Sequence, residues 1–209
     1  FVTSGVFYAN LSLFAPFVQS VLGYPADATG YMIAPRGVGV LLGVAASSAL
    51  RRFASDRVII SIGLAGSAIG IGSMTRFSLE TDPWTLTWTG ALQGICYGVM
   101  FAPLTAATFA TLEARLRTEA AALVQLVRQI SGGIGIAFAF TLLTRDGHGW
   151  TQALAETVNP GVAAALLDAG AAGLVQLQGE LARQAGLLAY LHVGGWLALA
   201  IVLVLPFVA

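Results

Sequence analysis

Two arginines stand inside stretches that are otherwise apolar. Arg36 lies in "MIAPRGVGVLLG" (32–43), and Arg128 lies in "VQLVRQISGG" (124–133). A guanidinium keeps its charge and offers five N–H donors. Arg36 therefore either donates to helix-end carbonyls, helped by the carbonyl that Pro35 frees, or lines a cavity where it holds an anionic group or excludes cations. We favour the first interpretation, a structural anchor.

A second set of polar and aromatic side chains recurs at helical spacing, which places its members on shared faces. Aromatic rings with few hydrogen-bonding groups suit a pocket for flat, amphipathic and even cationic compounds. Packing inside the core, or against another domain for the stripe with Arg128, is the alternative. The candidates for a substrate cavity are Gln93, Tyr97, Phe101, Gln125 and Arg128, with Tyr8 and Asn10 as further candidates.

Groups suited to covalent, acid–base or metal chemistry are few. The chain has two histidines, His148 and His192, and one cysteine, Cys96. An enzyme would need a cluster of His, Asp and Glu or a paired nucleophile and base, so we predict no catalytic residue, metal site or cofactor. His192 is a candidate proton site, because histidine changes charge near neutral pH. A histidine that is simply hydrogen-bonded at a membrane edge is the alternative.

The composition indicates the solvent around these residues. Of the 209 residues, 57% are hydrophobic and 10% are charged, and the mean hydropathy is +0.82. A soluble domain carries about a quarter charged residues, so most of this chain is expected to lie in lipid. The formal net charge is zero, unlike the basic surfaces that bind nucleic acid.

Six apolar stretches are long enough to cross a hydrocarbon layer as helices, which takes about 20 residues each. Arg51, Arg52, Arg57, Arg115 and Arg117 lie in the short loops 51–57 and 113–119. Arginine-rich loops stay in the cytoplasm, so the first helix is predicted to run outward. The six expected spans are 1–22, 29–50, 58–77, 86–110, 120–143 and 186–208.

The one long connection, 144–185, is expected on the outer side. Its second part, 171–185, has leucines at helical spacing and polar residues on its other faces. An amphipathic helix lying at the interface and leading into the last span fits this pattern. A loop folded on the outer surface is the alternative.

Small residues recur every three or four positions in 63–73 and 131–139, and they include the pair Gly66 and Gly70. Such faces let membrane helices approach closely. We expect close packing there, and sliding of these faces during a conformational cycle is the alternative.

Four segments together resemble a known family. The stretch "LGYPADATGYMIAPRGVGVLLG" (22–43) leads to "RRFASDR" (51–57), followed by "LQGICYGVMFAPLTAATFATL" (92–112) and "EAAALVQLVRQISGGIGIAF" (119–138). In order and spacing they resemble the C-terminal half of fourteen-helix major facilitator transporters of the EmrB/QacA drug:proton antiporter type.

The resemblance implies an all-α membrane protein in which residues 1–209 form a six-transmembrane-helix half of a major facilitator fold, made of two three-helix repeats. Such proteins export small amphipathic substrates in exchange for protons by alternating access. The implied partners are the missing N-terminal six-helix half or a second copy, and the implied location is a bilayer, the bacterial inner membrane. The cytoplasmic turn with Arg51, Arg52, Asp56 and Arg57 looks like the family's gating turn, although it also sets orientation.

Two features depart from the family pattern. Leu191 and His192 stand where related chains commonly carry an Asn-Asp pair, and no Asp or Glu lies in the middle of an expected span. Proton-carrying carboxylates are therefore expected in an N-terminal half. Because the chain begins at Phe1, we interpret it as part of something longer. The alternative to a transporter is a non-transporting membrane module or a truncated remnant that needs a partner half.

Overall fold

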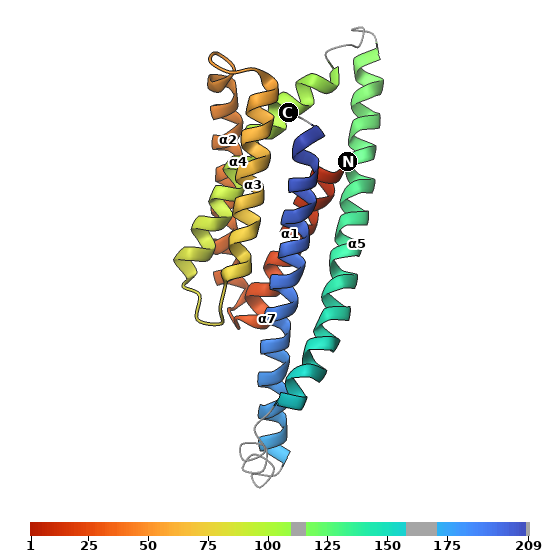
Figure 1. The fold of residues 1–209 in the computed structure, drawn as a ribbon. Helices are drawn as coiled ribbons and strands as arrows, with labels where there is room; N and C mark the ends of the chain where they lie inside the picture. The colour runs from red at the N-terminus through yellow and green to blue at the C-terminus, as the bar shows by residue number, and fades with distance from the viewer. Residues whose placement is uncertain (110–115, 158–170, 208–209) are drawn as a thin grey trace.

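The computed structural model describes residues 1–109, 116–157 and 171–207, which form helices joined by short turns and contain no strand (Figure 1). The α-helices are α1 (Val2–Pro16), α2 (Ala26–Leu50), α3 (Asp56–Ser73), α4 (Pro83–Phe109), α5 (Arg117–Thr157) and α7 (Ala171–Val204). A π-helical segment, Phe17–Val21, continues α1, and the 3₁₀ turns Met74–Arg76 and Leu205–Phe207 follow α3 and α7.

Five of the helices in the described part are long and apolar enough to cross a membrane. They are Ala26–Leu50, Asp56–Arg76, Pro83–Phe109, Arg117–Leu154 and Gln178–Val204. The first expected span, 1–22, is also helical from Val2 to Val21, but the change to π geometry after Pro16 leaves an α-helix of only 15 residues. The all-α membrane fold is thus confirmed.

The expected connection 144–185 is helical in both of its described parts, as expected for 171–185 but not for 144–157. α5 continues to Thr157, and α7 already begins at Ala171. In Figure 1 the lower parts of α5 and α7 extend beyond the other helices as a pair. The α-helix persists because its hydrogen bonds tolerate polar residues outside lipid, and no proline interrupts the chain before Pro160. Residues 158–170 lie outside the described residues. The amphipathic segment 171–185 is the first half of α7 and continues directly into the membrane span.

The turns divide between the two ends of the bundle. The turn between α2 and α3, with Arg51 and Arg52, lies at the same end as the C-terminus (Figure 1). The connections 22–25 and 77–82 lie at the opposite end. This arrangement agrees with the sidedness expected from the arginines.

Contacts between helices follow a two-fold pattern. The second helix of each three-helix set packs on the first helix of the other set, as α2 on α4 and α5 on α1. The third helices, α3 and α7, pack on each other, and each also contacts the first helix of the other set. This exchange is the arrangement expected of two repeated three-helix units.

Glycines bring the exchanged pairs into direct backbone contact. A Cβ added at Gly98 of α4 would lie 2.2 Å from the Val40 carbonyl oxygen of α2, and one at Gly135 of α5 would lie 2.3 Å from the Gly5 carbonyl oxygen of α1. The expected close packing at Gly66 and Gly70 is confirmed, because Cβ atoms there would meet Cys96 Sγ at 2.5 Å and Gln93 Cγ at 2.8 Å. The seam between α2 and α4 is a further glycine contact that the sequence patterns singled out above did not include.

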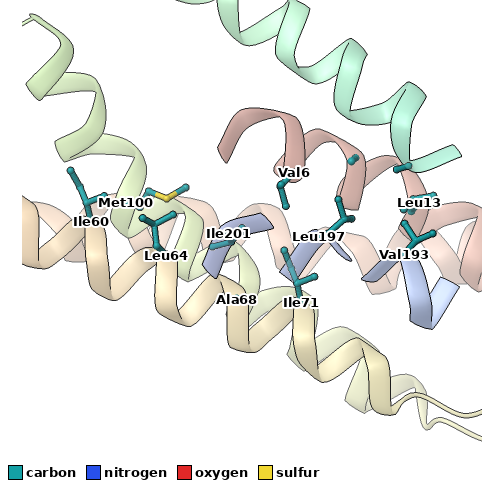
Figure 2. Packing of buried hydrophobic residues seen from close by; sticks show 12 residues of the cluster. Val6, Leu13, Ile60, Leu64, Ala68, Ile71, Met100, Val193, Leu197 and Ile201 are labelled. Atoms are coloured by element: carbon teal, nitrogen blue, oxygen red, sulfur yellow. The ribbon is translucent and has the colours of Figure 1, made fainter. Parts of the chain in front are cut away.

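The centre of the bundle is the region where α1, α3 and α7 meet. Buried aliphatic side chains from these helices interdigitate there, and Met100 of α4 joins them (Figure 2). Large apolar side chains such as Leu41, Ile134 and Leu203 instead lie on the outside. Apolar residues on both the inside and the outside are what a lipid-embedded bundle requires.

Candidate functional site

Aromatic side chains from α1 and α4 form a continuous row. The rings of Phe7 and Tyr97 stack with centroids 3.6 Å apart at 15°. Tyr8 meets the Phe7 ring edge-on at 5.7 Å, and Phe101 meets the Tyr97 ring at 5.8 Å. We call these four residues the aromatic row. Tyr97 and Phe101 are one helical turn apart, so their spacing along α4 places them together.

Arg128 of α5 caps one end of the aromatic row. Its guanidinium carbon lies 4.4 Å from the centroid of the Phe101 ring, and Nη2 donates to Thr105 Oγ1 at 2.9 Å. Three of the five expected cavity residues, Tyr97, Phe101 and Arg128, are thus in one place. Gln125 is exposed on α5, one turn before Arg128. This cation–π contact occupies one face of the Phe101 ring.

Arg36 is buried behind the row, with 5% of its surface exposed. Its Nη2 donates to Asn10 Oδ1, and its guanidinium carbon lies 5.6 Å from the centroid of the Phe7 ring. The expected helix-end carbonyls are therefore not the partner found here. The partner of Arg36 is Asn10 of α1, whose Nδ2 in turn donates to Met74 Sδ at 3.3 Å. In the described part of the chain, Arg36 Nε and Nη1 have no hydrogen-bond partner.

Gln93 is buried on the side of α4 that faces α3. Its Nε2 donates to the Gly70 carbonyl oxygen at 2.8 Å. Its Oε1 and the nearby Ser67 Oγ are both buried without a partner among the described residues. Gln93 therefore links helices in addition to lining a cavity.

Arg36, Ser67 and Gln93 line one cavity together with Phe7 and Tyr97. We call it the Arg36 cavity. The cavity is small and has room for about one water molecule. Unpaired polar atoms therefore face a space of about that size.

Phe7 and Ser67 were missed by the sequence patterns. Phe7 lies in an apolar run, where the sequence does not distinguish a site residue from a core residue. Ser67 lies in a glycine-rich helix, where a single serine is typical of a small packing residue. Whether a polar side chain lacks a hydrogen-bond partner can be decided only when its neighbours on the other helices are known.

His192 of α7 is part of a separate polar cluster between α5 and α7. Its Nδ1 lies 2.6 Å from Asp146 Oδ2 on α5, and its Nε2 accepts from Trp196 Nε1 at 3.2 Å. With Trp196 donating, Nε2 carries no hydrogen and the Nδ1 hydrogen points to the carboxylate. The sequence placed Asp146 in a loop, so its pairing with His192 was not expected.

In the turn between α2 and α3, an ion pair joins Arg51 Nε and Asp56 Oδ1 at 3.1 Å. Both side chains are more than a third exposed. Arg52 and Arg57 are exposed at the same turn. The pair links the end of α2 to the start of α3.

These features define a multi-pass helical membrane protein with a polar and aromatic site between helices of its two repeats. No family model matches the sequence. The chain is similar to the fatty acid resistance protein FarB of Neisseria gonorrhoeae, with 27% identity over 158 residues that cover 74% of this chain and 31% of the relative. It is also similar to multidrug resistance protein 3 of Bacillus subtilis, with 28% identity over 69% of this chain and 28% of the relative.

A third relative is the MFS-type transporter YhcA of Bacillus subtilis, with 23% identity over 66% of this chain and 26% of the relative. The expected resemblance to major facilitator drug transporters is therefore confirmed, at low identity. The chain spans roughly a quarter to a third of the length of these relatives.

Proposed function

We propose that this chain is the C-terminal six-helix half of an exporter that moves small amphipathic compounds out of a bacterial cell, across the inner membrane, in exchange for protons. The observation that carries the proposal is the aromatic row with Arg128 at its end, which joins α1, α4 and α5 across the two repeats. Two of the relatives are named for resistance to fatty acids and to multiple drugs, and these names support the same activity.

Alternating access requires a second half that closes the other side of the path. A missing N-terminal domain or a second copy of this chain would supply it. The turn with Arg51, Arg52, Asp56 and Arg57 is our candidate gate on the cytoplasmic side, because its ion pair can form in one state and break in another.

His192 is our candidate proton site within this chain. When His192 takes up a proton at Nε2, that nitrogen can no longer accept the hydrogen bond from Trp196 Nε1. Protonation would therefore break this hydrogen bond between His192 and Trp196. The main proton-carrying carboxylates are expected in the other half.

Reconstituted transport tests the proposal. The full-length natural protein, in liposomes with an imposed pH gradient, is expected to move an amphipathic fluorescent dye against its concentration gradient, and a protonophore is expected to abolish this movement. Tyr97→Ala should change the set of compounds moved, because it removes the centre of the aromatic row. Tyr31→Ala is the matched control, since Tyr31 is 80% exposed on α2.

Two results would count against the proposal. Dye movement that does not respond to the pH gradient would contradict the proposed coupling to protons. No movement of any compound, from a natural product whose intact mass is near 21.6 kDa, would favour a non-transporting module that needs a partner.

A further inference from the structure

The Arg36 cavity gathers buried polar atoms that have no hydrogen-bond partner among the described residues. They are Arg36 Nε and Nη1 of α2, Ser67 Oγ of α3 and Gln93 Oε1 of α4. The three residues are between 4% and 6% exposed, so bulk water does not reach these atoms. Buried polar groups are normally paired with protein or with ordered water, because an unpaired one destabilises the fold. The cavity therefore has the properties of a site for a small polar ligand.

Existing contacts hold two of these side chains in place. Arg36 Nη2 donates to Asn10 Oδ1, and Gln93 Nε2 donates to the Gly70 carbonyl oxygen. Backbone contact fixes the depth of α2 against α4, since a Cβ added at Gly94, the neighbour of Gln93, would lie 2.2 Å from the Arg36 carbonyl oxygen. The remaining polar atoms of Arg36 and Gln93 thus face the same cavity without pairing with each other.

The types of the unpaired atoms decide which ligand suits the cavity. The Arg36 nitrogens can only donate, Gln93 Oε1 can only accept, and the Ser67 hydroxyl can do both. A ligand must therefore accept from Arg36 and donate to Gln93 at the same time. A halide or a carboxylate has no hydrogen to donate, and a cation meets the like charge of Arg36. Water can both accept and donate, and the cavity has room for about one water molecule.

We propose that one buried water molecule binds in the Arg36 cavity. It accepts a hydrogen bond from one of the unpaired Arg36 nitrogens, donates one to Gln93 Oε1 and forms a third with Ser67 Oγ. Three hydrogen bonds are the usual number for a buried water. The water joins α2 and α3 of the first three-helix set to α4 of the second, directly behind the stacked rings of Phe7 and Tyr97. It is thus a bridge between the two repeats, and it goes beyond the proposed transport function.

Electron cryo-microscopy of the full-length natural protein in lipid nanodiscs, at a resolution that shows ordered waters, tests the site directly. A density peak is expected within about 2.5–3.2 Å of Gln93 Oε1, Ser67 Oγ and one Arg36 nitrogen. The peak should be equally strong in chloride and in bromide buffer, because bromide scatters more strongly than chloride and water is the same in both. The inference is overturned if no peak is found there, or if the peak grows in bromide, which would assign the cavity to a halide.

Ser67→Ala and Ser47→Ala form a matched pair for thermal unfolding of the same full-length protein. Both hydroxyls are buried without a partner among the described residues, but Ser47 does not line the Arg36 cavity. The change from serine to alanine adds the same helix propensity at both positions, so the difference between the variants reports the hydrogen bond to water. Ser67→Ala loses that bond and should melt about 2 °C or more below Ser47→Ala. A melting temperature of Ser67→Ala equal to or above that of Ser47→Ala would show that the Ser67 hydroxyl has no water partner and would overturn the inference.

These two measurements and the transport assay can fail separately. The density peak and the melting difference require a folded protein but no transport, so a protein that exports no compound can still uphold the water site. Export of a dye by a protein whose cavity shows no peak would uphold the exporter and refute the water site.

Discussion

Replacing Gly98 with alanine tests the closest helix–helix contact in the bundle. The new Cβ would lie 2.2 Å from the Val40 carbonyl oxygen and 3.0 Å from Gly43 Cα. Ordinary contact begins at 3.4 Å, so α2 and α4 must part by at least about 1.2 Å, the difference between the two distances. Both obstructing atoms are backbone, so no side chain can rotate away and the helices themselves have to move.

The matched control is Gly37→Ala. Gly37 is exposed on α2, and an added Cβ there meets nothing within 4 Å. Both substitutions gain the same helix propensity, about 1 kcal/mol, so the difference between them isolates the overpacking at the seam. Overpacking costs about 1–3 kcal/mol, which predicts an apparent melting temperature lower by roughly 2–12 °C for Gly98→Ala than for Gly37→Ala.

The assay is thermal unfolding of both variants in the same detergent at one scan rate. Gly43→Ala should behave like Gly98→Ala, since its Cβ would lie 2.2 Å from the Ile95 carbonyl oxygen. The double variant should lose less than the sum of the two, because helices already forced apart have room for the second methyl group. Equal melting temperatures for Gly98→Ala and Gly37→Ala would refute direct backbone contact between α2 and α4.

Three further predictions concern polar contacts. Asn10→Ala should lower the free energy of unfolding by about 1.5–3 kcal/mol, because it leaves a buried guanidinium N–H unpaired; an unchanged denaturation midpoint would contradict the anchor role. Reversing the charge of either residue alone, as Arg51→Asp or Asp56→Arg, should change the free energy of unfolding by at most about 1 kcal/mol, because the side chains are 37% and 46% exposed. Each single variant should nevertheless slow transport, and the double variant with both charges reversed should restore the rate. His192→Gln should leave the melting temperature unchanged but flatten the pH dependence of transport, and a wild-type pH profile would exclude His192 as a proton site.

Several features of the fold follow from local patterns in the sequence. The spans could be predicted because burying apolar side chains in lipid, with backbone hydrogen bonds satisfied inside each helix, depends on residues that are neighbours in the chain. The shared face of Gln93, Tyr97 and Phe101 could be predicted for the same reason, since residues four apart lie on one face of a helix. The helix that contains the expected span 120–143 continues to Thr157, because an α-helix does not have to end where lipid ends.

The partners across helices could not be predicted in this way. The hydrogen bond from Arg36 to Asn10, the Phe7–Tyr97 stack and the His192–Asp146 pair each join residues on different helices. Periodicity gives the direction of a side chain on its own helix but not the rotation or depth of the neighbouring helix.

By itself, the sequence determined that this protein is a helical membrane protein with two arginines inside apolar stretches, because hydropathy and charge spacing act along the chain. The tertiary structure alone decided that Arg36 retains two unpaired nitrogens beside Ser67 and Gln93. That outcome depends on how closely the glycine faces of α2, α3 and α4 approach one another, which is settled by packing among helices.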